Sequence, residues 1–586
     1  MFTSKSREIA TWSGVAGTLS LLLGCTGIMN GGSDGKGNMD PSYGVNATDG
    51  ANGSGKGNGS GSGQGGGVNG GGPYVPQVGV DPGTKPMHRL NDAEYNNSLH
   101  DALGTSLAPA DWSKGQGELY GFDNIAELLG MDTKTYTNFF NAAGKVAEEV
   151  MATPALKSAF ITCNAADAAC AQSVVTGAAL KLFRRPVVAD ELAIYGKVFS
   201  DAAALGETPE NALKHVLRSM LSSAEFLYRI ELDPTPGSVT PHKLGAYELA
   251  SRLSYFLWSS GPDKALLDAA GSNKLLEDGE LAAQTDRLLA DAKGERFVMN
   301  FGGQWLSIRQ LAAHAVDTGV FPSWTPAITA AETEEAYRFF NEFARGSQPW
   351  STFLKADFNF VNADLAKLYG MPAPAGAGLQ LVQVKDDHRF GYLGLGQFLT
   401  VSSYNHRTAP TLRARRILDQ LMCSAPPQPP AGLTIPPLDG DSGTAEAAAQ
   451  NIRQRLEMHR KNPVCAGCHA TFDAVGMALE NFDAIGQYRP TYPNGAAIDA
   501  SGQIADGKPF VGLEGLTDLL TNDPRFTSCV AEKLFIYSLG RGVEPTDRPY
   551  LDNVMHAWAS NTAVLPVLVK NLIQADTFRF RRGEAQ

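Results

Sequence analysis

Apolar side chains recur at helical spacing along most of the chain beyond residue 88. The clearest run extends from Leu244 to Leu257, and the pair Gly261-Pro262 ends it. Residues three or four positions apart share one face of an α-helix, so this run predicts an amphipathic helix. Thr240 and Pro241 stand just before the run and predict its N-cap and first turn.

The same pattern predicts helices elsewhere. One spans residues 89–104, with Asn91 as N-cap, Glu94 three residues later and Gly104 as the C-terminal stop. Two more are expected over 411–422 and from about 445 to 460. Strand-like alternation of apolar and polar residues is scarce. The sequence therefore predicts a mainly α fold, with a multi-module helical body.

The segment 26–86 has a different composition. Gly, Ser and Asn dominate it between Gly31 and Gly72, and no apolar periodicity is present. Such a segment buries too little surface to offset the entropy lost on ordering, so we expect a disordered tether. The remaining chain is too long for one hydrophobic core. We expect the following organisation: 1–25 a lipoprotein-type signal, 26–86 the tether, then helical modules at 87–153, 154–237, 238–386, 387–499 (with the C-x-x-C-H motif) and 500–586.

Net charge narrows the classes of partner. The formal charge is −12 and neither sign gathers in a long block. An acidic chain of this kind is a poor match for nucleic acid. No G-x-x-x-x-G-K-[ST] loop is present, so a nucleotide site is not expected.

One short motif carries distinctive chemistry. Cys465, Cys468 and His469 form C-x-x-C-H, the spacing by which a c-type haem is attached. Two thiols three positions apart can each add to a porphyrin vinyl group, and the adjacent imidazole then reaches the iron. The alternatives are a zinc half-site, a redox dithiol or a disulfide-stapled turn.

The sixth iron ligand is left open by the sequence. His459 is one candidate, and Met477 is a second because a thioether raises the potential of a haem. Met477 lies eight residues after His469, about 12 Å along an unbroken helix, so both would reach one iron only if the helix broke at Gly476. His406 is a third histidine of the same region, and the position is equally compatible with water.

The N-terminus predicts export. Lys5 and Arg7 precede a short apolar run that ends in Leu22-Leu23-Gly24-Cys25. A basic start and an apolar segment too short to span a membrane are typical of a signal peptide. The last four residues resemble a bacterial lipoprotein box, in which Cys25 receives lipid. Thr26 follows, and we expect a cell-envelope lipoprotein anchored at the outer membrane by lipid alone; an ordinary cleaved signal is the alternative.

Several longer motifs resemble one known family. It comprises multidomain secreted planctomycete and myxobacterial cytochrome-like proteins built of serial domains of unknown function (DUF1587, DUF1595, DUF1592, DUF1588 and DUF1585 type). The matching stretches are Arg89–Gly104, Lys181–Leu192, Tyr247–Trp258, Gly391–Arg413, Cys465–Gly486 and Cys529–Gly542. The departures are Ala102, Phe472, Ala474, Met477 and Ser538, and the thiols and imidazole of the motif are intact. The resemblance covers nearly everything from His88 onward.

The remaining cysteines can be paired. Cys163 and Cys170 lie close together in an exported chain, which favours a short-loop disulfide over a metal site. With Cys25 assigned to lipid and the C-x-x-C-H thiols to haem, Cys423 and Cys529 remain. Exported free thiols are uncommon, so we expect a second disulfide between them.

Three functions stay open at this stage. The first is a surface-tethered protein with covalent haem c that serves electron transfer and a redox protein partner. The second is a non-haem surface protein that binds polysaccharide or another protein, with C-x-x-C-H as a structural or zinc site. A hydrolase is the weakest, because no G-x-S-x-G or H-E-x-x-H motif is present.

The anchor can be tested directly. Cys25→Ser removes the thiol that would carry lipid, so we expect the variant to leave the membrane fraction for the soluble envelope fraction. Fractionation followed by immunoblotting measures this. Membrane association equal to that of the unaltered chain would contradict the anchor.

Overall fold

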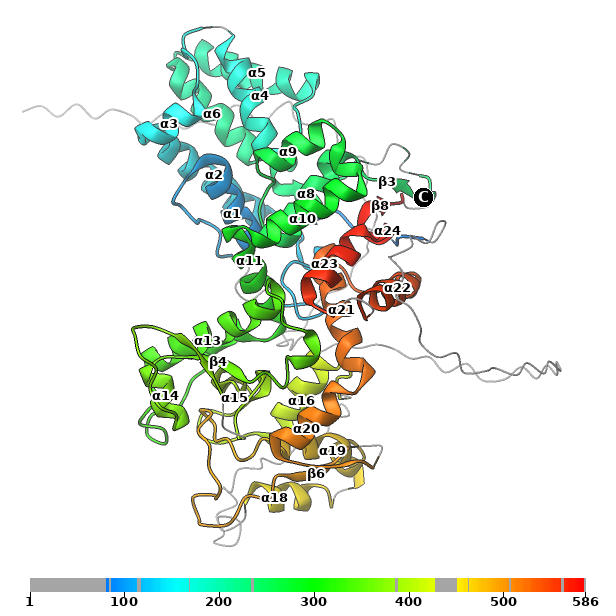
Figure 1. Ribbon diagram of the computed structural model, residues 1–586. Helices are drawn as coiled ribbons and strands as arrows, with labels where there is room; N and C mark the ends of the chain where they lie inside the picture. The colour runs from blue at the N-terminus through cyan, green and yellow to red at the C-terminus, as the bar shows by residue number, and fades with distance from the viewer. Residues whose placement is uncertain are drawn as a thin grey trace, which may run out of the picture. The chain divides into compact units, whose positions relative to one another are not determined.

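The structure is a computed structural model, and it describes residues 81–83, 86–112, 117–167, 169–232, 235, 237–384, 388–426, 451–461, 463–504, 507–559 and 563–583. The expected signal, Cys25 and nearly all of the tether lie outside these residues. The described chain is mainly helical, as the sequence predicts (Figure 1). Within it, no helix combines the length and apolar character needed to cross a membrane.

The α-helices are α1 (Asp92–Leu103), α2 (Thr133–Ala152), α3 (Pro154–Phe160), α4 (Cys170–Leu182), α5 (Ala189–Ala204), α6 (Pro209–Leu221), α7 (Ala224–Leu227), α8 (Ala246–Trp258), α9 (Lys264–Gly271), α10 (Asp278–Ala290), α11 (Glu295–Phe297), α12 (Gly303–Trp305), α13 (Pro326–Ala344), α14 (Ala363–Tyr369), α15 (Gly396–Val401), α16 (Pro410–Arg416), α18 (Ile452–His459), α19 (Pro463–Met477), α20 (Gly512–Thr521), α21 (Pro524–Leu539), α22 (Arg548–Ala559), α23 (Leu565–Gln574) and α24 (Asp576–Arg579). Short 3₁₀ turns are η1 (Ala126–Leu128), η2 (Lys274–Leu276), η3 (Ala292–Gly294), η5 (Ile308–Ala313), η6 (Trp350–Thr352), η7 (Tyr392–Gly394) and η9 (Pro545–Asp547), and π-turns are η4 (Val298–Gly302) and η8 (Ile417–Leu421).

Local capping signals set the bounds of α1. The Asn91 side chain accepts from the Glu94 amide at 2.9 Å, and the Glu94 carboxylate accepts from the Asn91 amide at 3.1 Å. This reciprocal pair is a capping box. Gly104 ends the helix in the left-handed conformation, with φ of 75°. The expected helix over 89–104 is confirmed, apart from its first residues.

The expected start of α8 is wrong. The helix begins at Ala246, where the Glu248 carboxylate accepts from the Gly245 amide at 2.7 Å. Residues 242–243, which follow the expected cap at Thr240-Pro241, form strand β3 (His242–Lys243) and pair with β8 (Phe580–Arg581). The extended backbone of that pairing delays the helix, and the partner strand lies far away in sequence.

Two further expected helices differ in detail. The helix expected over 411–422 forms as α16 and continues as the π-turn η8. The helix expected from about 445 is described only as α18, with Asn451 as its N-cap, because residues 427–450 lie outside the described range.

The strands are short and pair in twos among the described residues. They are β1 (His88–Arg89) with β2 (Tyr228–Arg229), β3 with β8, β4 (Phe358–Val361) with β5 (Gln380–Gln383), and β6 (Ser501–Gln503) with β7 (Pro509–Val511), all antiparallel. The first two pairs join segments that are distant along the chain, so they tie modules together rather than build a sheet.

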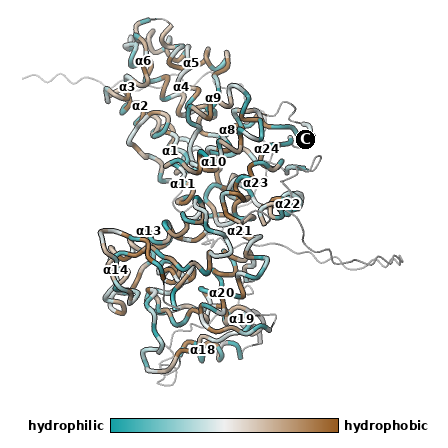
Figure 2. The backbone as a smooth tube through the Cα atoms, in the orientation of Figure 1, coloured by the Kyte–Doolittle hydropathy of each residue, from teal (hydrophilic) through white to brown (hydrophobic). Residues whose placement is uncertain are grey.

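The largest hydrophobic core is shared between modules. Brown and teal residues alternate along most helices in Figure 2, as expected for helices that bury one face. The Tyr537 ring of α21 lies 5.3 Å from that of Phe122, 6.1 Å from Phe256 and 5.4 Å from Phe301, measured between ring centroids. These residues come from the first, third and fifth expected modules. A second core lies among α1–α7.

Aromatic side chains of the third module lie in the core, as the sequence favours. Trp258, Trp305 and Trp350 are each at most 3% exposed. The rings of Trp305 and Trp350 stack with centroids 5.8 Å apart. Burial of such large rings stabilises the fold and leaves them unavailable for a ligand groove.

Buried arginines join segments that lie far apart along the chain. The Arg184 guanidinium donates to the Phe226 carbonyl at 3.0 Å and to the Tyr228 carbonyl at 2.6 Å. Arg252 donates to the Phe578 carbonyl at 2.7 Å and forms two bonds to the Glu231 carboxylate. Both arginines are at most 3% exposed. A buried guanidinium is tolerated only with its donors satisfied, so these contacts fix the segments precisely.

Both disulfides expected from the sequence are present. Cys163 bonds to Cys170 across seven residues, and Cys423 bonds to Cys529 across 106 residues. The second joins the segment after η8 to α21. It therefore links the module that contains C-x-x-C-H to the last one.

The long-range disulfide should contribute more stability than the short one. Loop-closure entropy predicts a loss of about 4–5 kcal/mol when Cys423 and Cys529 are both replaced by Ala, and about 2 kcal/mol for the matched Cys163 and Cys170 pair. Chemical denaturation under oxidising conditions compares the two variants. Equal losses, or free Cys423 and Cys529 thiols in non-reducing peptide maps of the unaltered chain, would contradict this.

Candidate functional site

The C-x-x-C-H motif lies within helix α19, which runs without interruption from Pro463 to Met477. Position 465 lies three residues before 468 and four before 469, and positions 468 and 469 are adjacent. The three positions therefore lie next to one another on one helix face. The structure describes the backbone at the two cysteines, and their thiols lie outside its described side chains. His469 is described in full.

His469 is held by a carboxylate one helical turn further on. Its Nδ1 lies 3.0 Å from Oδ1 of Asp473, and its ring lies against Phe472 with centroids 4.9 Å apart. The His469 side chain is 19% exposed and that of Asp473 is 2% exposed. Because Nδ1 is engaged by Asp473, a ligand role falls to Nε2. Metal-binding histidines regularly have their other nitrogen fixed in this way.

Helix α16 packs closely against the second half of α19 (Figure 1). The Thr411 hydroxyl donates to Asp473 Oδ1 at 3.3 Å, so α16 also contributes to the carboxylate that holds His469. Gly476 lies directly against the Pro410 carbonyl, where any Cβ would overlap the backbone. The glycine is required by this close approach, which keeps α16 and α19 in register.

The loop after α19 is held by a buried arginine from α16. The Arg413 guanidinium donates to the carbonyls of Leu479 at 2.6 Å, Phe482 at 2.9 Å and Asp483 at 2.7 Å. Arg413 is fully buried, and burial lowers its pKa to about 10. The guanidinium still carries its charge at neutral pH, and its bonds fix the loop that leaves α19.

Further polar contacts hold α16 and the loop after α19 together. Arg389 donates to the carbonyls of Gly394 and Gly486. The Thr408 hydroxyl donates to Glu480 Oε1 at 2.7 Å, and Arg489 donates to the same oxygen at 2.8 Å. These hydrogen bonds therefore join segment 389–413 to segment 479–489. Helix α19 packs against the first segment and leads into the second.

The structure separates the candidates for the sixth iron ligand. Met477 is 3% exposed and packs with Ile452, Leu456 and Tyr492 in a small hydrophobic cluster. Since α19 is unbroken at Gly476, Met477 and His469 are not brought to opposite sides of one iron. The side chain of His459 lies outside the described ones. His406 is exposed on the loop before α16, where its Nδ1 contacts Asn405.

His469, the one motif residue whose side chain the structure describes, fits the role of a haem ligand. One imidazole projects from α19 with its tautomer fixed by a buried carboxylate, and Asp473 Oδ2 is itself buried without a hydrogen-bond partner. Among described side chains, which exclude both thiols of the motif, no group of three or more His, Cys, Asp and Glu could hold a metal.

A pair of buried carboxyl groups lies on α13, near Arg389. Glu332 and Glu335 are both fully buried. Glu335 accepts from Asn359 Nδ2 at 2.6 Å and from the Tyr369 hydroxyl at 2.9 Å, and the Arg389 guanidinium lies 3.8 Å from the centre of the Tyr369 ring. Neither Glu332 oxygen has a hydrogen-bond partner.

The environment keeps these carboxyls protonated at a higher pH than usual. Burial raises the pKa of Glu335 to about 7. Burial, together with the neighbouring Glu335, raises the pKa of Glu332 well above its ordinary value. Arg389 lies near Glu332 and Glu335 and also donates to the Gly486 carbonyl. Ionisation of these two carboxyl groups would therefore change the electrostatic potential beside the loop after α19.

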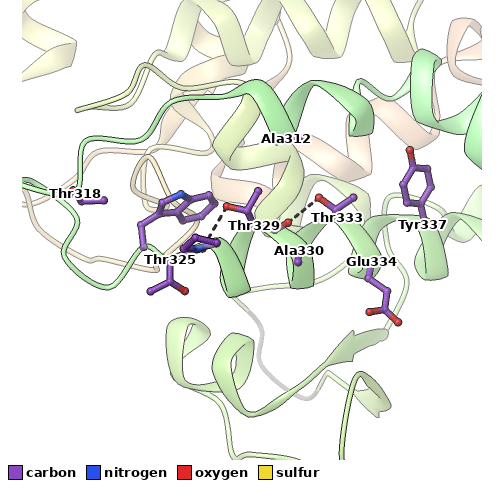
Figure 3. A pocket seen from close by; sticks show the side chains of 10 residues that line it. Ala312, Thr318, Thr325, Thr329, Ala330, Thr333, Glu334 and Tyr337 are labelled. Atoms are coloured by element: carbon purple, nitrogen blue, oxygen red, sulfur yellow. Dashed lines mark hydrogen bonds between the residues drawn. The ribbon is translucent and has the colours of Figure 1, made fainter. Parts of the chain in front are cut away.

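A separate groove of about 760 Å³ runs beside α13 (Figure 3). Thr329, Thr333 and Tyr337 line it, and the Thr333 hydroxyl donates back to the Thr329 carbonyl at 2.7 Å. Its one carboxylate, Glu334, pairs with Arg338 at 2.5 Å. Among these lining residues, no nucleophilic side chain contacts a side chain that could act as its base.

The sequence identified the motif residues but not the side chains that hold them in place. Asp473 was visible only as a nearby carboxylate, although its spacing of four residues from His469 was the available signal. Arg413 belongs to a recognised motif, yet its three carbonyl partners follow no sequence pattern. The Glu332–Glu335 pair gives no signal, because i,i+3 carboxylates usually mark a solvated helix face.

Five family models match the chain in series. Each is described as a protein of unknown function: DUF1587 over residues 88–152, DUF1595 over 170–231, DUF1592 over 244–371, DUF1588 over 389–492 and DUF1585 over 506–578. The chain belongs to the multidomain family that these five serial domains define. The DUF1588 model, which covers C-x-x-C-H, has the cytochrome-like short name PSCyt3. No curated protein and no solved structure matches the chain.

The buried carboxyl pair predicts a specific pH dependence. A folded-state pKa above the unfolded value means that the folded chain holds protons that the unfolded chain releases, so stability falls as pH rises from about 4.5 toward and through the raised values. Glu332→Gln removes part of this loss. We expect its melting temperature, relative to the unaltered chain, to increase steadily between about pH 5 and pH 8.

Glu334→Gln is the matched control, because this neighbour on α13 has a side chain that is 49% exposed. Its difference from the unaltered chain should stay constant across the same range. Differential scanning fluorimetry measures both variants. A pH-independent effect of Glu332→Gln would contradict a raised pKa at this position.

Proposed function

We propose that this family member is an exported, surface-tethered protein that binds haem c covalently and takes part in electron transfer within an extracytoplasmic redox system. Cys465 and Cys468 would form the thioether bonds, and His469 would ligate the iron through Nε2. Bound haem would supply one-electron chemistry. Lipid on Cys25 and the segment 26–86 would tether the helical body to the envelope.

The contact between His469 and Asp473 is the observation that carries this proposal. An isolated C-x-x-C-H would suit a redox dithiol or a zinc half-site equally well. A dithiol needs no adjacent imidazole of fixed tautomer, whereas a histidine that ligates haem iron or zinc does. The C-x-x-C-H spacing is that of haem attachment, which favours iron over zinc. The buried carboxylate at 3.0 Å from Nδ1 supplies that constraint.

The surrounding residues have supporting roles in this proposal. Asp473 holds the imidazole orientation, and Gly476 lets α16 approach α19 closely enough for Thr411 to reach the same carboxylate. Arg413 fixes the loop that follows. A rigid frame of this kind favours electron transfer, because little reorganisation accompanies a change in charge. The cytochrome-like name of the DUF1588 model gives independent support.

Mass and absorbance test the cofactor. Protein matured in an export-competent, haem-attaching host should gain roughly 616 Da and a Soret band. Replacing Cys465 and Cys468 with Ala should abolish both, whereas the control replacement of Cys163 and Cys170 should retain them. A mature chain that lacks the added mass would overturn the haem proposal and favour a structural, redox or zinc role for the motif.

Asp473→Asn tests the supporting contact separately. The amide keeps the size of the side chain but removes the negative charge beside His469. We expect unchanged covalent mass and a higher midpoint potential, because the carboxylate stabilises the more positively charged oxidised iron. Asp364→Asn is a control on a distant exposed helix start. Equal potentials in all three proteins would remove Asp473 from the proposed site.

A further inference from the structure

The buried carboxyl groups of Glu332 and Glu335 lie where α13 packs against β4, α14 and α15 (Figure 1). Glu335 accepts from Asn359 of β4 and from Tyr369 of α14. At the start of α15, a Cβ on Gly396 would overlap both the Glu332 carboxyl and the Tyr369 hydroxyl. The pair is therefore packed tightly between the DUF1592 and DUF1588 parts of the chain.

The pair has no counter-ion in direct contact. Among the described residues, Glu332 has no hydrogen-bond partner, and Glu335 bonds to neutral side chains. The guanidinium of Arg389 acts on both carboxyl groups from nearby, but it donates instead to the carbonyls of Gly394 and Gly486. A buried carboxylate without a partner is unfavourable, so this arrangement suits carboxyl groups that are protonated.

The other titratable groups around the pair supply no positive charge. Tyr369 is a phenol, and burial raises its pKa, so it stays neutral. Asp483, on the loop after α19, is acidic, and burial raises its pKa as well. Thr400 of α15 and Asn359 of β4 are neutral. Arg389 is therefore the cation that these three carboxyl groups share.

Arg389 lies between the pair and the loop after α19. Its guanidinium is 3.8 Å from the centre of the Tyr369 ring, whose hydroxyl binds Glu335, and 5.0 Å from the centre of the Phe482 ring in the loop. Its bond to the Gly486 carbonyl holds the loop. A guanidinium binds a carboxylate more strongly than a neutral carbonyl, so ionisation of the pair would draw Arg389 away from Gly486.

We propose that Glu332, Glu335 and Arg389 form a pH-dependent latch on the loop after α19. When both carboxyl groups are protonated, Arg389 binds the Gly486 carbonyl and the loop is closed. When the pair ionises, the guanidinium turns to the carboxylates and residues 484–489 are released. The latch uses no residue of the C-x-x-C-H motif, so it acts whether or not haem is bound.

The release is confined to the second half of the loop. Arg413 binds three carbonyls within residues 479–483, and these bonds do not involve the latch. Residues 484–489 follow them. The Gln487 amide donates to Asp483 Oδ1 at 2.8 Å, so opening of this part exposes an amide that is bonded in the closed state.

The direction of the pH dependence follows from burial. Burial raises the pKa of Glu335 to about 7, and burial together with the neighbouring Glu335 raises that of Glu332 well above its ordinary value. The pair is therefore protonated in acid and ionises as the pH rises through and above neutral. Exposed carboxylates elsewhere stay ionised over that range.

Hydrogen–deuterium exchange of the full mature chain tests the latch. Exchange is compared at about pH 5.5 and about pH 8.5, with labelling times scaled for the pH dependence of exchange in unstructured peptides. We expect the corrected exchange of residues 484–489 to be about tenfold faster at the higher pH, because the loop opens locally. Exchange in α2, far from the latch in sequence, should not change.

The double replacement of Glu332 and Glu335 by Gln is the decisive variant. It preserves side-chain size and removes both titrations, so residues 484–489 should exchange slowly at both pH values. Glu334→Gln is the matched control, because its side chain is 49% exposed on the same helix, and it should keep the pH response. Arg389→Lys keeps the charge but loses the planar fork, so the loop should exchange fast even in acid.

Three results would overturn the latch. The first is exchange of residues 484–489 that does not depend on pH, and the second is an unchanged pH response in the double variant. The third is equally faster exchange in α2 at the higher pH, which would indicate general unfolding. If Arg389→Lys does not fold, the double variant and Glu334→Gln still decide. Haem is measured separately by mass and absorbance, so the two proposals succeed or fail independently.

Discussion

The fold depends on buried guanidinium groups that join segments lying far apart along the chain. Charge removed from water is costly unless every donor finds an acceptor, and the planar fork of Arg demands acceptors in fixed directions. Main-chain carbonyls supply most of them here. Arg184 binds the carbonyls of residues 226 and 228, Arg252 binds that of Phe578, and Arg413 binds three in the loop after α19. Displacing any of these segments would leave a buried charge uncompensated.

This constraint explains the motifs that identify the family. Arg184, Arg389, Arg413 and Arg541 lie in or beside the short stretches that resemble the family, and such polar motifs could be mistaken for catalytic signatures. Each is at most 3% exposed. Arg541, for example, pairs with the buried Asp547 at 2.6 Å. Their role is to join segments, and two of them, Arg389 and Arg413, fix the loop that leaves α19.

Sequence reasoning succeeded where the determining interactions are local. The capping box of Asn91 and Glu94 fixes α1, and the count of cysteines, taken with the expectation of export, led to both disulfides. It failed at α8, because the strand that delays this helix pairs with residues 580–581. Within the site, spacing located His469, while the burial of Asp473 depends on α16. The contact of Glu480 with Thr408 was equally invisible, because it joins residues that lie 72 positions apart in the sequence.

The pairing of β3 with β8 has a consequence for how the chain reaches its folded state. Lys243 pairs with Phe580 in these strands. Arg252 donates to the carbonyl of Phe578, which lies 326 residues later in the sequence. Helix α8 therefore emerges during synthesis long before its partners exist. The contacts that hold the third domain are therefore complete only once the end of the fifth domain has been added to the chain.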